Sequence, residues 1–388
     1  MRRLVGYAAI AGVALQFSSP ARGEQVTSKI FMGTVGKQPV VLELKRRSDS
    51  DKVEGRYFYK KYRFDLPLSG TVQSDGHISL QEGESSFGDP QAGMELRPRS
   101  DGSLYGSWTG KNGNVIPVML KPVSGLPTID PPDSYLLQLK EKDAFEFVRL
   151  ADLKLQRGKR ERFMGYALQW MVELGSKIAI PLIEDGYSDP QREKINRLLR
   201  ARLWEEVSNY YECVGSGNLR SGGNYDQTVT PRLINGRVVS FSIFTEYYCG
   251  GAHPDSGHSP ITLDARTGKE LTLEDVVSVG KGKPVHYEAA ERRVGGRDFD
   301  ALATYRTRYL APWLVRQVLA VDKTAFGEHE CHLEDSQYWQ FPGWYLTRKG
   351  IGVTPSVPHV MAACTNSWVI PYAVLRSHPG VIQGIPSP

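Results

Sequence analysis

Between residues 24 and 121, short apolar runs alternate with turn sequences at close and regular spacing. The turns Ser74-Asp75-Gly76, Ser100-Asp101-Gly102 and Lys111-Asn112-Gly113 are typical of hairpin connections. About eight strands fit between such turns. This pattern predicts an all-β N-terminal domain over residues 24–121, a small antiparallel meander that forms a barrel or a sandwich. A barrel of this kind could also enclose a small apolar ligand.

A proline-rich stretch marks the end of this region. Residues 122–132 read Pro-Val-Ser-Gly-Leu-Pro-Thr-Ile-Asp-Pro-Pro, which predicts an extended linker over residues 122–134. The rest of the chain, residues 135–388, mixes strand and helix patterns. We expect an α+β C-terminal domain with helices packed on an antiparallel sheet.

Local patterns within the C-terminal domain support this class. Residues 144–155 and 167–172 are expected to form strands. Ser188-Asp189-Pro190-Gln191 supplies a capping residue and a proline for the first turn of a long helix. Asn235-Gly236 between two apolar runs predicts a hairpin. Residues 302–320 are expected to form a helix that is interrupted at a proline.

The first 23 residues have the layout of a signal peptide. Met1-Arg2-Arg3 precedes an apolar run that ends near Phe17, and Ala21-Arg22-Gly23 places small residues where signal peptidase reads them. We expect cleavage before Glu24 and a periplasmic or secreted protein. The apolar run is shorter than the about 20 residues that a spanning helix needs. No transmembrane segment is therefore expected in the mature chain.

Charge and compartment together argue against a nucleic-acid partner. The full chain has 48 Lys and Arg residues and 43 Asp and Glu residues. Three arginines, Arg2, Arg3 and Arg22, would leave with the signal peptide, which reduces the net charge to about +2. Nucleic-acid binders usually carry a pronounced basic face. The remaining basic clusters, such as residues 157–162, are short and are typical of solvated turns.

The four cysteines are expected to form two disulfides. An even number of cysteines in an exported chain favours this state. Three connectivities are open, and proximity in sequence favours Cys213–Cys249 and Cys331–Cys364.

Two motifs in the C-terminal half carry a family resemblance. They are Phe244-Thr245-Glu246-Tyr247-Tyr248-Cys249-Gly250-Gly251-Ala252-His253 and Asp264-Ala265-Arg266-Thr267-Gly268-Lys269. Over about residues 170–377 the chain resembles the RsiV/PdaC-type C-terminal domain of unknown function. The resemblance implies an extracytoplasmic α+β domain. It also implies a binding role, because such a domain binds lysozyme in RsiV and accompanies a separate catalytic domain in PdaC-type deacetylases.

The loop after the first motif is the expected binding region. Turn-rich loops on a rigid sheet often carry recognition, which selects Tyr247, Tyr248, His253, Asp255 and His258. The spacing of the two histidines matches no known zinc pattern, so we expect neither a metal nor a cofactor. No spacing selects a catalytic set.

The leading hypothesis is a non-enzymatic periplasmic or secreted binding protein. Its partner would be a lysozyme-like hydrolase or peptidoglycan, the glycan of the cell wall. The alternative is an envelope hydrolase that acts on cell-wall material. Its site would lie near His253, or near His329 in Glu328-His329-Glu330-Cys331-His332, where carboxylates and imidazoles are densest.

Overall fold

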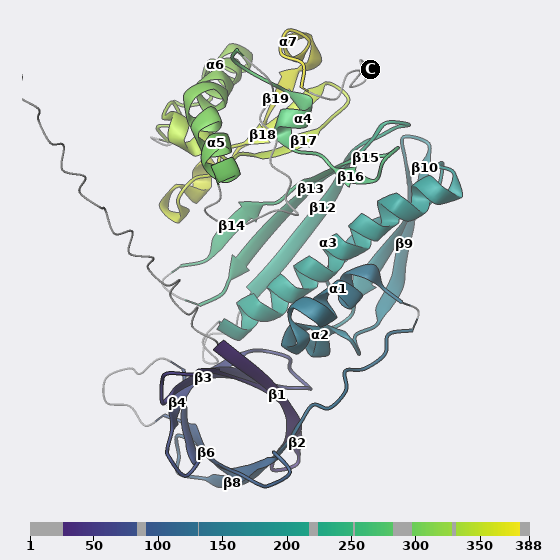
Figure 1. Cartoon of the computed structure of the whole chain (residues 1–388). Helices are drawn as coiled ribbons and strands as arrows, with labels where there is room; N and C mark the ends of the chain where they lie inside the picture. Colours follow the sequence, from purple (N-terminus) through teal and green to yellow (C-terminus); the bar gives the residue numbers. More distant parts are fainter. Residues whose placement is uncertain are drawn as a thin grey trace, which may run out of the picture.

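The chain folds into three stacked parts (Figure 1). An eight-stranded barrel lies at one end, a layer of sheet and helices follows, and a C-terminal part with α5 and α6 lies beyond it. The expected signal peptide at residues 1–23 lies outside the described residues. The computed structural model describes residues 26–83, 91–130, 132–216, 224–250, 253–281, 297–327 and 331–380.

The barrel is a meander in which each strand pairs antiparallel with the next, and β1 closes the ring against β8. The predicted all-β meander is confirmed, and of the two arrangements left open the chain takes the barrel. The strands are β1 (Val26–Val35), β2 (Gln38–Arg47), β3 (Lys52–Tyr59), β4 (Leu66–Val72), β5 (Ile78–Glu82), β6 (Gly93–Pro98), β7 (Leu104–Thr109) and β8 (Val115–Pro122).

Apolar side chains fill the barrel interior. On β6, Met94 and Leu96 are buried whereas Glu95 between them is exposed, as the two-residue period of a strand requires. Met94 and Leu96 pack in one cluster with Leu80 of the neighbouring strand β5 and with Leu120 of β8. An eight-stranded barrel is just wide enough to be filled by such side chains or to hold one small ligand, so the enclosed apolar ligand stays a prediction.

Gly106 on β7 lies where neighbouring strands leave no room for a side chain. A Cβ atom at this position would lie 1.8 Å from the carbonyl oxygen of Glu95. We expect Gly106→Ala to lower the free energy of unfolding by about 1–3 kcal/mol, because the strands must move apart. Urea unfolding measures the loss. Gly125→Ala is the control, since no atom lies within 4 Å of its Cβ position, and equal stability of the two variants would contradict the prediction.

Two short helices follow the barrel, α1 (Ser134–Lys142) and α2 (Ala144–Leu150). The prediction of a strand over residues 144–155 is therefore wrong, since the strand β9 begins only at Leu155. Asp143 caps α2 by accepting a hydrogen bond from the backbone N–H of Glu146. The alternation of Phe145 and Phe147 is typical of a strand. Here both rings are buried because α2 is covered on several sides.

Helix α2 is fixed to the outer wall of the barrel by Arg149. This side chain is 1% exposed and donates to Asp65, which directly precedes β4, and to the carbonyl of Arg63. Its Nε atom lies 2.9 Å from Glu146, and its guanidinium lies over the ring of Phe58. A buried arginine thus joins acidic groups of the barrel and of the next layer.

The middle layer is built from two antiparallel sheets and one long helix. The predicted strand at residues 167–172, the helix from residue 189 and the Asn235-Gly236 hairpin are all confirmed. The elements are β9 (Leu155–Phe163), β10 (Tyr166–Glu173), β11 (Ala179–Asp185), α3 (Asp189–Ser216), β12 (Asn224–Ile234), β13 (Val238–Tyr248), β14 (Asp255–His258), β15 (Ile261–Asp264) and β16 (Lys269–Glu270).

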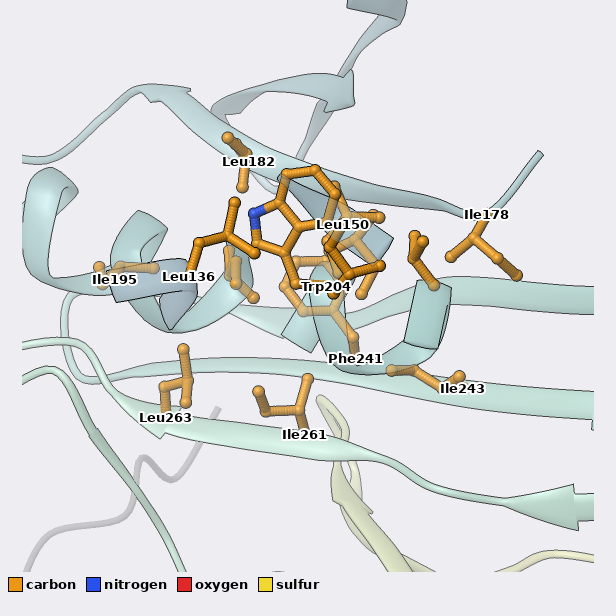
Figure 2. Close-up of a cluster of buried hydrophobic side chains, with 14 of the residues drawn as sticks. Leu136, Leu150, Ile178, Leu182, Ile195, Trp204, Phe241, Ile243, Ile261 and Leu263 are labelled. Atoms are coloured by element: carbon orange, nitrogen blue, oxygen red, sulfur yellow. The ribbon is translucent and has the colours of Figure 1, made fainter. Parts of the chain in front are cut away.

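Helix α3 packs between the two sheets. Figure 2 shows Trp204 of α3 with Leu182 of β11 on one side and Phe241 of β13 on the other. The same buried cluster includes Val41 of β2 and Phe58 of β3, whose side chains point outward from the barrel and pack among the helices. The outer face of the barrel therefore contributes to the core of the middle layer, while the barrel interior holds a separate apolar cluster.

The C-terminal part has its own core around a three-stranded sheet, β17-β18-β19. The helix expected over residues 302–320 is present, and Pro312 lies in the first turn of α6 after a π-helical turn. The elements are α4 (Leu273–Val276), α5 (Arg297–Tyr305), the π-helix η2 (Arg306–Leu310), α6 (Ala311–Val321), the 3-10 helix η3 (Ser336–Trp339), β17 (Gly343–Leu346), β18 (Gly350–Thr354), the 3-10 helix η4 (His359–Cys364), β19 (Trp368–Pro371) and α7 (Tyr372–Leu375). The α+β class of the C-terminal region is confirmed.

Two disulfides link the chain, Cys213–Cys249 and Cys331–Cys364. This is the pairing that proximity in sequence favours. Disulfides are typical of proteins that fold outside the reducing cytosol. Among the helices of the described ranges, none has the length and apolar character needed to cross a membrane.

Candidate functional site

An open cleft of about 380 Å³ lies where the C-terminal half of α3 meets the strands β12, β13 and β14. Helix α3 contributes Arg202, Glu205 and Glu206 to its lining, and the strands contribute Tyr225 and Tyr247 among others. The Cys213–Cys249 disulfide joins the last turns of α3 to the residue after β13, with a Cα–Cα distance of 4.5 Å. The walls of the cleft are therefore covalently linked.

Glu206 is the central polar group of the cleft and is only 3% exposed. Its Oε1 atom lies 2.8 Å from Nε of Arg202, one helical turn earlier. Its Oε2 atom accepts hydrogen bonds from Gln227 at 2.7 Å and from the Tyr225 hydroxyl at 3.3 Å. Ser259 donates to Oε1 at 3.4 Å. Both carboxylate oxygens are thus occupied, and Glu206 holds α3 against the strands.

Three tyrosine rings line up from α3 across the strands. Tyr210 packs edge-on against Tyr225 at 5.7 Å, and Tyr225 stacks against Tyr247 at 6.2 Å. Burial, followed by the Glu206 carboxylate, raises the pKa of Tyr225. Burial and the carboxylate of Asp255 likewise raise the pKa of Tyr247. Both hydroxyls therefore stay protonated at neutral pH and act as hydrogen-bond donors.

Asp255 connects the cleft to a pair of histidines. Its Oδ2 atom accepts a hydrogen bond from Tyr247 at 3.3 Å, and its Oδ1 atom lies 3.4 Å from Nδ1 of His359 on η4. The His359 ring stacks on that of His253, with 5.3 Å between ring centroids and 12° between planes. The fold thus brings an acidic group, a phenol and two imidazoles together beside the cleft.

The predicted binding residues are only partly brought together. Tyr247 and His258 line the cleft, and Asp255 contacts Tyr247. His253 does not line the cleft but stacks on His359, which lies beside Asp255. Tyr248 does not line the cleft either, and strand alternation places it on the opposite face of β13 from Tyr247. His329 falls outside the described residues.

Sequence reasoning missed the residues that α3, β12 and η4 supply. Arg202 and Glu206 are spaced four residues apart on a helix, which is the spacing of an ion pair on one face. This spacing can be read from the sequence, but it does not predict which strands the Arg202–Glu206 pair contacts. No signal near His359 could have placed it beside Asp255, since 104 positions separate the two residues.

His258 lies against Phe244, with 4.7 Å between ring centroids. Its Nδ1 atom is buried and has no hydrogen-bond partner within the described ranges. Burial, with a smaller effect of the Arg232 guanidinium, holds the pKa of His258 below its usual value. The folded chain therefore favours the neutral ring.

This shift predicts a pH dependence of stability. The unfolded chain takes up a proton at His258 below about pH 6.5, while the folded chain resists it, so stability falls as the pH falls through that value. We expect His258→Gln to lose less stability than the wild type between about pH 7.5 and about pH 5. Urea midpoints at the two pH values test this. Equal losses for both proteins would contradict it.

No cluster of three or more His, Cys, Asp or Glu residues with the geometry of a metal site occurs in the ranges that the structure describes. The stacked His253 and His359 rings lie parallel, whereas imidazoles that share one metal converge on it.

Comparisons with known proteins leave the family open. No family model matches the sequence, and no curated protein matches it. Among solved structures, the chain is similar to the crystal structure of a member of the DUF3298 family from Bacteroides fragilis, with 17% sequence identity and a TM-score of 0.34. The likeness covers 59% of this chain and 94% of that one. That neighbour belongs to a family of unknown function, and a likeness of this degree carries no conclusion about activity.

Proposed function

We propose that this chain is a non-enzymatic periplasmic or secreted protein that binds cell-wall glycan in the cleft beside the Cys213–Cys249 disulfide. The observation that carries the proposal is the stacked pair of Tyr225 and Tyr247 on the wall of an open polar cleft. The RsiV/PdaC resemblance points to the same envelope setting.

The chemistry of the lining suits a saccharide. Tyrosine offers an apolar ring face and a hydroxyl, so it can contact both the C–H faces and the hydroxyl groups of a sugar. The cleft volume of about 380 Å³ is in the range of small-ligand sites. Fixed walls reduce the entropy lost on binding, and the disulfide together with the Glu206 network fixes them.

The state of Glu206 supports binding rather than hydrolysis. A general acid or base must exchange a proton with the substrate, and it needs an accessible oxygen for this. Both oxygens of Glu206 already contact groups of the protein, and the side chain is almost fully buried. The carboxylate is therefore suited to positioning the cleft wall.

The test is co-sedimentation of the protein with insoluble peptidoglycan. We expect Tyr247→Ala to weaken binding about tenfold, since loss of an aromatic contact in a binding site costs more than about 1 kcal/mol. Tyr105→Ala removes an exposed tyrosine of the barrel and is the matched control. The proposal fails if wild type does not sediment with peptidoglycan, or if both variants bind alike.

A lysozyme-type muramidase is the other ligand that the resemblance suggests. The same variants are therefore tested for muramidase capture. Capture that Tyr247→Ala abolishes, without glycan binding, would assign the cleft to a protein partner and overturn the glycan proposal.

A second candidate, an envelope hydrolase, has one observation in its favour. Asp255 lies 3.4 Å from Nδ1 of His359, which is ion-pair distance without a hydrogen bond, and a carboxylate beside an imidazole is a starting point for a general base. Release of soluble fragments from peptidoglycan, abolished by Asp255→Asn and by His359→Ala, would support this candidate. Absence of release by the wild type would exclude it.

A further inference from the structure

Strand β9 carries a dense set of exposed cations at the edge of a sheet. It pairs with β10 and lies at the outer end of the order β11-β10-β9. Every residue from Gln156 to Arg160 is exposed, and Arg157, Lys159 and Arg160 have 68%, 63% and 69% of their side-chain surface open to solvent. Figure 1 shows β9 on the side of the molecule away from β14 and from the cleft walls.

Packing does not explain this composition. Within β9 only Leu155, Glu161 and Phe163 are even half-buried, so the strand adds little to the core. A few charges suffice to keep an edge strand from pairing with another chain. Here Lys154, just before the strand, adds to the four cations of β9, and like charges so close together repel one another.

Two of the arginines are held in place. Glu184 on β11 accepts from Arg157 at 2.9 Å and from Arg160 at 2.7 Å, so both side chains extend across the sheet. Glu161 lies 3.3 Å from Lys159. Five cations against these two carboxylates leave the surface basic overall, and the anchored arginines have lost part of their rotational freedom before any ligand arrives.

The turn at the end of this strand exposes an apolar side chain in an unfavourable conformation. Met164 has a φ of 52° and is 39% exposed. Glycine and asparagine adopt this left-handed conformation readily, whereas methionine does so at a cost. Strained residues of this kind concentrate at functional sites. Met164 lies two positions after Arg162, the last cation of the strand.

We propose that the β9–β10 hairpin docks the protein on an anionic phospholipid surface. The cations of β9 contact the phosphate headgroups, and Met164 enters the interface between headgroups and acyl chains. Basic side chains next to an exposed apolar one are the combination that holds peripheral proteins at such surfaces. The inference does not depend on the function of the cleft, which lies on other elements.

The experiment is flotation of the full-length mature protein with vesicles. Binding is expected to phosphatidylcholine vesicles that contain phosphatidylglycerol and to weaken as salt is raised, whereas pure phosphatidylcholine vesicles do not bind. The triple variant Arg157→Gln, Arg160→Gln and Arg162→Gln is expected to bind roughly 100-fold more weakly, at about fivefold per cation.

Two controls keep the result specific. The first control is a second triple variant, which removes the same charge from exposed positions of the barrel: Lys37→Gln, Lys52→Gln and Lys121→Gln. It is expected to have little effect on vesicle binding. Met164→Asn is expected to weaken binding while keeping or raising thermal stability, because asparagine tolerates the left-handed conformation.

Several outcomes would overturn the proposal. These are equal binding to neutral and anionic vesicles, equal loss in the two triple variants, and full vesicle binding by Met164→Asn. Displacement by inorganic phosphate, beyond that by chloride at equal ionic strength, would assign the surface to free phosphate. Tighter binding to soluble polyphosphate than to vesicles would assign it to a polymer. Tyr247→Ala is expected to float as the wild type does, so that failure of the cleft proposal and failure of this one are distinguishable.

Discussion

Arg149→Ala is expected to lower the free energy of unfolding by about 3–5 kcal/mol, because it removes one partner of a buried ion-pair group. The arginine is 1% exposed, and its removal leaves the Asp65 and Glu146 carboxylates largely buried with fewer partners. Burial already raises the pKa of Glu146, and loss of the guanidinium would raise it further. Urea unfolding, followed by tryptophan fluorescence, measures the loss.

The control for this prediction is an exposed ion pair. Arg97 contacts Asp75 at 3.5 Å with more than half of each side chain open to solvent. Arg97→Ala is expected to cost no more than about 1 kcal/mol, as surface pairs do. If Arg97→Ala and Arg149→Ala lost similar amounts, the buried cluster would not stabilise the contact between the barrel and α2.

Replacing Cys331 and Cys364 by alanine is expected to lower the free energy of unfolding by about 3–4 kcal/mol in the chain-entropy account of cross-links. The two cysteines are 33 positions apart and both are buried in the core of the C-terminal part. Without the bond, the segment between them gains freedom in the unfolded chain while the packed core stays the same.

Reduction supplies the matched comparison. The double alanine variant is expected to unfold at a lower urea concentration than the oxidised wild type. Under reducing conditions the difference should shrink, because the wild type then loses the same cross-link. A double variant as stable as the oxidised wild type would show that this bond contributes nothing to stability.

The barrel could be predicted from sequence because its signals are local. Each hairpin turn lies beside the strands that it joins, as at Ser100-Asp101-Gly102 between β6 and β7, and every strand pairs with its neighbour in the chain. Helix α2 could not be predicted in this way. Its aromatic residues alternate as in a strand, and only the contact with the barrel makes a helix with several buried faces the stable form.

The candidate site was predictable only where one loop carries it. The motif contains Tyr247 and the loop after it contains His258, and both residues line the cleft. The opposite wall comes from α3, where Glu206 lies about 40 positions earlier in the chain. Its role depends on Gln227 and Tyr225 closing around it, which is a tertiary arrangement that a residue pattern does not encode.

The outward-facing Val41 and Phe58 affect how the barrel and the middle layer separate on proteolysis and on unfolding. Both are fully buried, yet they pack among the helices of the following layer instead of inside the barrel. A protease cut in the stretch between β8 and α1 is therefore expected to leave two fragments that co-elute. The barrel expressed by itself would present these side chains to water and self-associate. Barrel and middle layer should melt as one cooperative unit, so a single calorimetric transition is expected for both.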